Sequence, residues 1–147
     1  MRRIADFQFG RGAGDALFPD KTTFSYSNTK RIRYANLGKT RLVTVRAGDG
    51  RLTLGYAAAE RLHTFLPAPK NRVVVMADAV PFILDGKNAM AKHVIASDPD
   101  IMAEDEVFVG DENDNRLATG MASLSGTEML GFSYGTAVKV RQGKNRQ

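Results

Sequence analysis

The residues best suited to chemistry in this chain are a glycine, a lysine and an asparagine that stand together between two apolar segments. Gly86-Lys87-Asn88 follows the β-branched run Val73–Val75 and precedes the apolar pair Val94-Ile95. A glycine lets backbone N–H groups come close to a phosphate, and a lysine supplies positive charge. The stretch 72–96, RVVVMADAVPFILDGKNAMAKHVIA, therefore predicts two strands, joined through a turn at Val80-Pro81-Phe82 and a short helix or turn, with the working surface between them.

Few residues are suited to catalysis or to metal binding. The chain has no cysteine and only two histidines, His63 and His93, so a zinc site is not expected. The polar loop 111–115 lacks the glycine and the later glutamate at the spacing of a calcium-binding EF-hand. Three glycines at positions 10, 12 and 14 are spaced like a dinucleotide loop, but Pro19 leaves no room for the helix that must follow. We expect no metal, no cofactor and no catalytic residue.

Charge is distributed unevenly along the chain. The net charge is +5, made of +9 in residues 1–72 and −4 in residues 73–147. The basic first half suits a polyanion such as nucleic acid, although a solubilising surface has the same composition. Residues 98–114 hold eight acidic side chains and no lysine or arginine, so they should repel RNA and lie away from any RNA-binding face. The absence of cysteine and of a long apolar run fits a cytoplasmic protein.

The first half predicts an antiparallel meander with packed helices. Residues 4–19 predict a glycine-bounded turn and a short helix, and residues 56–65 a second helix. Arg31 and Arg33 alternate with Ile32 and Tyr34, which places the two arginines on one face of a strand, either simply solvated or in contact with a nucleic-acid backbone. The predicted strands are residues 22–27, 31–36, 41–46 and 51–54.

The second half predicts a small closed β-barrel. Residues 66–70, LPAPK, read as a stiff linker, which divides the chain into an α+β domain, 1–70, and a mostly-β domain, 71–147. Strands are predicted at 106–110, 116–122 and 137–140. Ser125 and Glu128 form the pattern of a capping box at the start of a short helix, and the basic tail 141–147 is expected to fray.

The order of these segments resembles that of a known RNA-binding module. The stretches VPFILDGKNAMAKHV, DPDIMAEDEVFVGDENDNRLATG, MASLSGTEML and AVKVR are similar to a PUA domain, named for pseudouridine synthases and archaeosine transglycosylases. The first half, through ADFQFGRGAGDALF and DGRLTLGYAAAERL, is similar to the domain that precedes PUA in archaeal tRNA-guanine transglycosylase. The resemblance covers nearly the whole chain.

This resemblance implies an archaeal protein with an α+β pre-PUA domain and a PUA pseudo-barrel that together hold tRNA. In the family a separate barrel domain exchanges the base; because no such domain lies in this chain, we expect no independent enzymatic activity. Carried over from the family, the RNA-binding residues are Pro81, Phe82, Gly86, Lys87, Asn88, Ala91, Lys92, His93, Lys139 and Arg141. Arg31 and Arg33 are weaker candidates. For Phe82, packing into the core is the favoured interpretation, and His93 either stacks on RNA or fills a strand position.

Three functions remain open at this point. The first is a binder of structured RNA, with tRNA favoured, that acts alone or with a separately encoded tRNA-modification enzyme. The second is a ribosome-associated or protein-interaction adaptor that presents the acidic surface of residues 98–114 to a basic partner. The third is an unrecognised enzyme, against which the missing cysteine and the two isolated histidines count. No membrane partner is expected.

Overall fold

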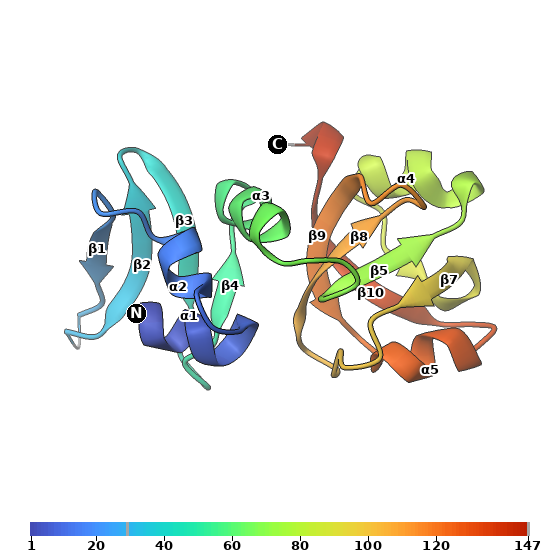
Figure 1. Ribbon diagram of the computed structural model, residues 1–147, viewed down its shortest axis with the longest axis horizontal. Helices are drawn as coiled ribbons and strands as arrows, with labels where there is room; N and C mark the ends of the chain where they lie inside the picture. The colour runs from blue at the N-terminus through green and yellow to red at the C-terminus, as the bar shows by residue number, and fades with distance from the viewer. Residues whose placement is uncertain (29, 147) are drawn as a thin grey trace. The chain divides into compact units, whose positions relative to one another are not determined.

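The computed structural model describes residues 1–28 and 30–146 (Figure 1). The chain divides into two compact units, Met1–Leu66 and Pro67–Gln147. The division falls within the segment Leu66–Lys70, a few residues before the boundary predicted at 70/71. Each unit has its own sheet and its own buried side chains, so each is described separately.

Among its described residues the first unit has a four-stranded antiparallel sheet, as the strand pattern predicts, and three helices. The strands lie in the sheet in their order along the chain. Its largest fully buried side chains come from the helices (Phe9, Leu17, Leu62), from the strands (Leu42, Leu52) and from Phe18, which follows the second helix. The elements are α1 (Arg2–Phe9), α2 (Ala13–Leu17), β1 (Thr23–Tyr26), β2 (Ile32–Leu37), β3 (Thr40–Val45), β4 (Leu52–Leu54) and α3 (Tyr56–Phe65).

Helix α1 was not expected from the sequence, which suggested only a turn before a short helix. Its buried face consists of Ala5 and Phe9, one helical turn apart, whereas Phe7 is 95 % exposed. The exposed phenylalanine hides the helical period, because apolar residues at 4, 7 and 9 do not mark one face. Asp6 then accepts a hydrogen bond from the backbone N–H of Gly14 at 2.7 Å, which fixes the turn between α1 and α2.

The second unit is a six-stranded, nearly closed barrel. The strand order is β6-β10-β9-β8-β5-β7, and the sheet is mixed because β5 and β8 run parallel. Helices α4 and α5 lie at opposite ends of this sheet (Figure 1). The elements are β5 (Arg72–Val75), η1 (Ala77–Ala79), α4 (Val80–Leu84), β6 (Ala89–Met90), η2 (Ala91–His93), β7 (Val94–Ser97), β8 (Glu106–Gly110), β9 (Arg116–Ala122), α5 (Gly126–Gly131), β10 (Thr136–Gly143) and η3 (Lys144–Arg146).

Alternating apolar side chains fill the barrel. Val73 and Val75 of β5, Val107 and Val109 of β8, and Val138 of β10 are buried in a single cluster. Ser125 caps α5 as predicted: its hydroxyl accepts from the N–H of Glu128, and the Glu128 carboxylate accepts from the N–H of Ser125 at 3.0 Å. This reciprocal pair satisfies two backbone donors that a helix start leaves without partners.

Two segments differ from their predicted form. Val80-Pro81-Phe82 belongs to helix α4 and is not a turn, because a proline in the first helical turn needs no backbone N–H. The tail does not fray at residue 141: strand β10 runs to Gly143. Gly143 lies directly against the backbone of Leu84 and Gly86, where a Cβ has no room. The end of β10 is therefore packed under the Gly86 turn. The last residue, Gln147, lies outside the described residues.

Membrane insertion was not expected from the composition. Among the described residues, none of the helices is both long and apolar enough to cross a bilayer.

The loop between β8 and β9 is held by one carboxylate, which yields a pH prediction. Asp111 accepts hydrogen bonds from the backbone N–H groups of Asn113 and Asn115 and from the Asn115 side chain, each at 2.9 Å. The bond from the Asn115 side chain is the largest cause that lowers the pKa of Asp111 below its ordinary 3.8. The stability that Asp111 contributes is therefore present above pH 3.8. It is lost as the pH falls through the lowered pKa of Asp111.

Replacing Asn115 with alanine should bring the pKa of Asp111 back toward 3.8, measured by NMR titration of its carboxyl carbon. The matched control is Asn113→Ala, since Asn113 donates to Asp111 through its backbone N–H, which alanine retains. A pKa that stays low in Asn115→Ala would contradict the assigned cause.

Candidate nucleic-acid interface

A hollow of about 410 Å³ in the second unit collects four of the residues predicted to bind RNA. Phe82, Lys87, Asn88 and His93 line it. The remaining lining residues are Ala79, Ile83 and Met90. The hollow thus combines an aromatic ring, an ammonium, a side-chain amide and an imidazole on a partly apolar floor. These are the groups that contact bases, phosphates and sugars in protein–RNA complexes.

The turn after α4 brings these side chains together. The N–H of Gly86 donates to the carbonyl of Ile83, and the N–H of Lys87 donates to the carbonyl of Phe82, both at 3.0 Å. Gly86 has a φ of +93°, a conformation that glycine adopts without strain. The chain therefore reverses at Gly86, and Lys87 emerges beside the helix that carries Phe82.

Phe82 lies on the surface and not in the core, contrary to the favoured interpretation of the sequence. Its side chain is 61 % exposed, while its neighbour Ile83 is buried at 1 %. Helix α4 is too short for its apolar run, VPFIL, to reveal which residue faces inward. An exposed phenylalanine at the rim of this hollow offers a ring face for stacking.

Asn88 has a structural role as well as a place in the hollow. Its side-chain oxygen accepts a hydrogen bond from the N–H of Val140 in β10 at 3.0 Å. Next along the chain, β6 pairs with β10 through Ala89–Val138 and Met90–Thr136. The amide of Asn88 thus fastens the Gly86 turn to the barrel.

The other predicted residues of this segment lie beside the hollow. Ala91 is buried and donates its N–H to the carbonyl of Gly135 at 2.9 Å, so its role is structural. Lys92 is exposed on η2, and Pro81 is exposed in the first turn of α4. The carbonyl of His93 accepts from the N–H of Met76 at 2.9 Å, which fixes the end of η2 from which His93 reaches the hollow.

Lys139 and Arg141 of β10 have different surroundings. Lys139 is exposed, paired across the strands with Met121. Arg141 forms an ion pair with Glu106: the guanidinium nitrogen lies 2.6 and 2.7 Å from the two carboxylate oxygens. The side chain of Glu106 is fully buried, whereas that of Arg141 is 34 % exposed. The main task of Arg141 is therefore to neutralise a buried carboxylate, a role that sequence reasoning missed.

Several carboxylates of the acidic segment 98–114 are engaged within the second unit. Asp98 accepts from the backbone N–H of Asn71 at 2.8 Å, and Asp114 pairs with Arg72 at 3.2 Å. Glu106 pairs with Arg141, and Asp111 holds its own loop. Much of the acidic charge thus serves to fix loops and strand ends, and it leaves less for an external partner.

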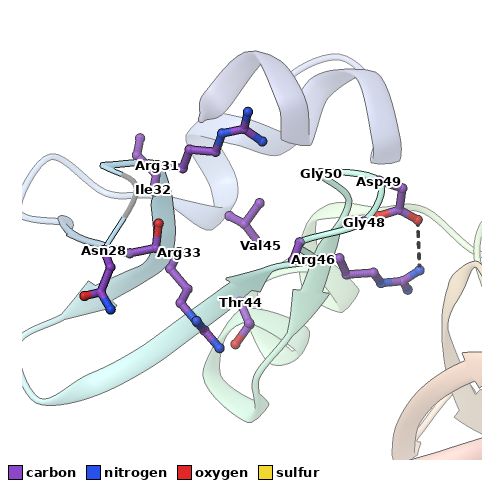
Figure 2. Close-up of a pocket in the computed structure, with 12 residues that line it drawn as sticks. Asn28, Arg31, Ile32, Arg33, Thr44, Val45, Arg46, Gly48, Asp49 and Gly50 are labelled. Atoms are coloured by element: carbon purple, nitrogen blue, oxygen red, sulfur yellow. Dashed lines mark ion pairs between the residues drawn. The ribbon is translucent and has the colours of Figure 1, made fainter.

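Arg31 and Arg33 line a separate hollow of about 730 Å³ in the first unit (Figure 2). The pairing of β2 with β3 ends at Tyr34–Thr44, while Ile32 pairs with β1 and Val45 with β4. The hollow lies between these diverging strands. Arg46 also lines it, held by Asp49 at 3.6 Å and by the Thr53 hydroxyl at 3.2 Å. The sequence placed Arg31 and Arg33 on one strand face, but it did not associate Arg46 with them.

Comparison with known proteins places this geometry in context. The PUA domain profile matches residues 71–144, just over half of the chain. The chain belongs to the PUA-domain family. The profile described as the patch-forming domain C2 of tRNA-guanine transglycosylase matches residues 1–69. The chain therefore carries these two domains in the order that the resemblance of its sequence implies.

Three relatives illustrate the extent of the similarity. The tRNA-guanine(15) transglycosylase of Pyrococcus furiosus is 51 % identical over 140 residues, which are 95 % of this chain and 24 % of that protein. A hypothetical protein of Pyrococcus horikoshii has a similar structure, with a TM-score of 0.70, 25 % identity and coverage of 97 % and 91 % of the two chains. A PUA domain protein of Thermoplasma acidophilum shares the fold, with a TM-score of 0.61, 19 % identity and coverage of 97 % and 90 %. The chain spans about a quarter of the length of the curated relatives it matches.

The ion pair between Arg141 and Glu106 leads to a stability prediction. Replacing Arg141 with alanine leaves a buried carboxylate without this partner and should lower the free energy of unfolding by about 3 kcal/mol. Urea denaturation followed by circular dichroism measures the change.

The exposed neighbour Lys139 provides the matched control. Lys139→Ala removes the same charge from the same strand and should change the unfolding free energy by no more than about 0.5 kcal/mol. Equal effects of the two substitutions would mean that Arg141 does not stabilise Glu106.

Proposed function

We propose that this PUA-domain protein binds structured RNA through the hollow that Phe82, Lys87, Asn88 and His93 line, and that its preferred RNA is tRNA. The observation that carries the proposal is the convergence of these side chains on one exposed hollow of a PUA domain. Lys87 and Lys92 supply charge for phosphates, while Phe82 and His93 supply ring faces for bases or riboses. Pro81 and the Gly86 backbone complete the surface. On β10, the exposed residue Lys139 is the candidate for contact with the RNA backbone.

Support for tRNA comes from the relatives, which are named for the modification of tRNA guanine. About three quarters of their length has no counterpart in this chain. We propose that the present chain supplies RNA binding and no catalysis, and that a separately encoded tRNA-modification enzyme is its partner in the cytoplasm. The arginine hollow of the first unit, with Arg31 and Arg33, is the second RNA contact in this proposal.

An adaptor function remains the second candidate, because the exposed carboxylates of Asp100 and Glu112 belong to the acidic segment. A basic protein, such as a ribosomal protein, would suit them. The engagement of Asp98, Glu106 and Asp114 within the chain favours the RNA-binding function instead.

Removal of the two lysines tests the proposed interface. The double variant Lys87→Ala Lys92→Ala should bind tRNA more weakly than the wild type. The slope of log affinity against log salt should become shallower by roughly 1.4 to 1.8, since each neutralised phosphate contributes about 0.7 to 0.9. Fluorescence anisotropy with labelled tRNA at several salt concentrations measures both quantities.

Three further variants allow the result for the lysines to be interpreted. Lys70→Ala is the charge control, because Lys70 is exposed just before β5, whose other end leads to α4. Arg31→Gln Arg33→Gln addresses the first unit and should also reduce the slope, with Lys39→Gln of the β2–β3 turn as its control. Unchanged affinity and slope in the lysine double variant would refute the assigned interface.

The proposed partnership yields a separate prediction. A transglycosylase that lacks its own C-terminal domains should incorporate labelled base into tRNA with a lower KM when this chain is added, because the chain holds the tRNA. The chain alone should incorporate none. Incorporation by the chain alone would overturn the non-catalytic role, and an unchanged KM would overturn the partnership.

A further inference from the structure

Two aromatic rings stand exposed on the loop between α5 and β10. Phe132 is 43 % exposed and Tyr134 is 78 % exposed. Their centroids are 6.2 Å apart and their planes differ by 12°, so the rings lie nearly parallel. Burial of aromatic rings away from water is favourable. A stacked pair of rings in solvent leaves the outer face of each ring available to stack on a third planar group.

The loop is held against the segment that carries Lys92. Thr136 pairs with Met90, and the N–H of Ala91 donates to the carbonyl of Gly135 at 2.9 Å. This hydrogen bond places the loop next to η2, the segment that carries Lys92. Met90 lines the hollow of the proposed RNA interface. The loop that carries the two rings therefore adjoins that interface where β6 pairs with β10.

We propose that Phe132 and Tyr134 form a stacking platform for an unpaired base of the bound RNA, next to a phosphate held by Lys92. The proposal rests on the function proposed above and adds a second kind of contact, with single-stranded nucleotides. The neighbouring charge supports this occupant: Lys92 is exposed on η2, to which the loop is hydrogen-bonded, and the loop 132–135, FSYG, contains no carboxylate. Stacking accepts any base, because every base has a flat face, so the platform should select unpaired RNA and not a sequence.

The conformation of the loop suits this role. Phe132 ends helix α5, where its N–H donates to the carbonyl of Glu128 at 3.1 Å. Gly135 turns the chain into β10 with a φ of +91°. Both ends of the loop are thus fixed by backbone hydrogen bonds, which hold the backbone positions that carry the two rings.

The test uses the full chain and two RNA probes: a blunt hairpin, and the same hairpin with a short 3′ overhang that carries 2-aminopurine. Fluorescence of 2-aminopurine falls when it stacks on an aromatic ring. The wild type should bind the overhang hairpin more tightly than the blunt one and quench the probe. Tyr134→Leu, which keeps apolar bulk but removes the ring, should bind the overhang hairpin roughly tenfold or more weakly and should not quench.

The matched control is Tyr134→Phe, which keeps the ring and should behave as the wild type. The slope of affinity against salt should stay unchanged in Tyr134→Leu, because no phosphate contact is lost. Wild-type affinity and quenching in Tyr134→Leu, or an equal loss for both hairpins, would overturn the stacking platform. If Lys87→Ala Lys92→Ala still weakens binding in that case, the proposed function stands without the platform. Failure of the wild type to bind either hairpin would overturn both.

Discussion

The pairing of β10 with β6 is the contact on which the candidate interface depends. It joins the end of the chain to a two-residue strand that separates the Gly86 turn from η2. On one side the side chain of Asn88 accepts from Val140, and on the other the N–H of Ala91 donates to Gly135. A two-residue strand cannot hold itself in place, so these flanking bonds keep Lys87 and Lys92 on the same edge of the barrel. The packing of Gly143 under the same turn adds a third restraint.

Acidic and basic side chains of the second unit have different surroundings. Several carboxylates are engaged within the unit, where they hold loops or pair with arginines such as Arg72 and Arg141. The lysines Lys87, Lys92 and Lys139 remain exposed. The flexible stem of a lysine lets its ammonium reach a phosphate at the solvated surface, whereas the planar guanidinium of an arginine suits a fixed carboxylate. A near-neutral or even acidic domain can therefore still present a face that is locally attractive to RNA.

Local patterns were sufficient to predict much of this fold. Alternation revealed the strands of both units, and the serine and glutamate of α5 revealed its start, because these signals depend on residues a few positions apart. The pattern failed at α1, where Phe7 is exposed, and at α4, where Phe82 and not Ile83 faces solvent. The Glu106–Arg141 pair joins residues 35 positions apart, so no local pattern can reveal it. The local sequence indicated this pair only through a glutamate at the start of the apolar strand EVFVG.

The form of the hollow bears on what it can bind. A small-molecule site usually encloses most of its ligand. Here the rim residues Phe82, Lys87 and Asn88 are themselves exposed, so a small molecule would keep much of its surface in water. A polymer does not need enclosure, because several weak contacts along its length act together. Charge contacts to phosphates set the salt dependence of such binding, and ring contacts to bases add affinity that salt does not screen. An open hollow that continues along one sheet edge is therefore better suited to a segment of nucleic acid than to a free metabolite.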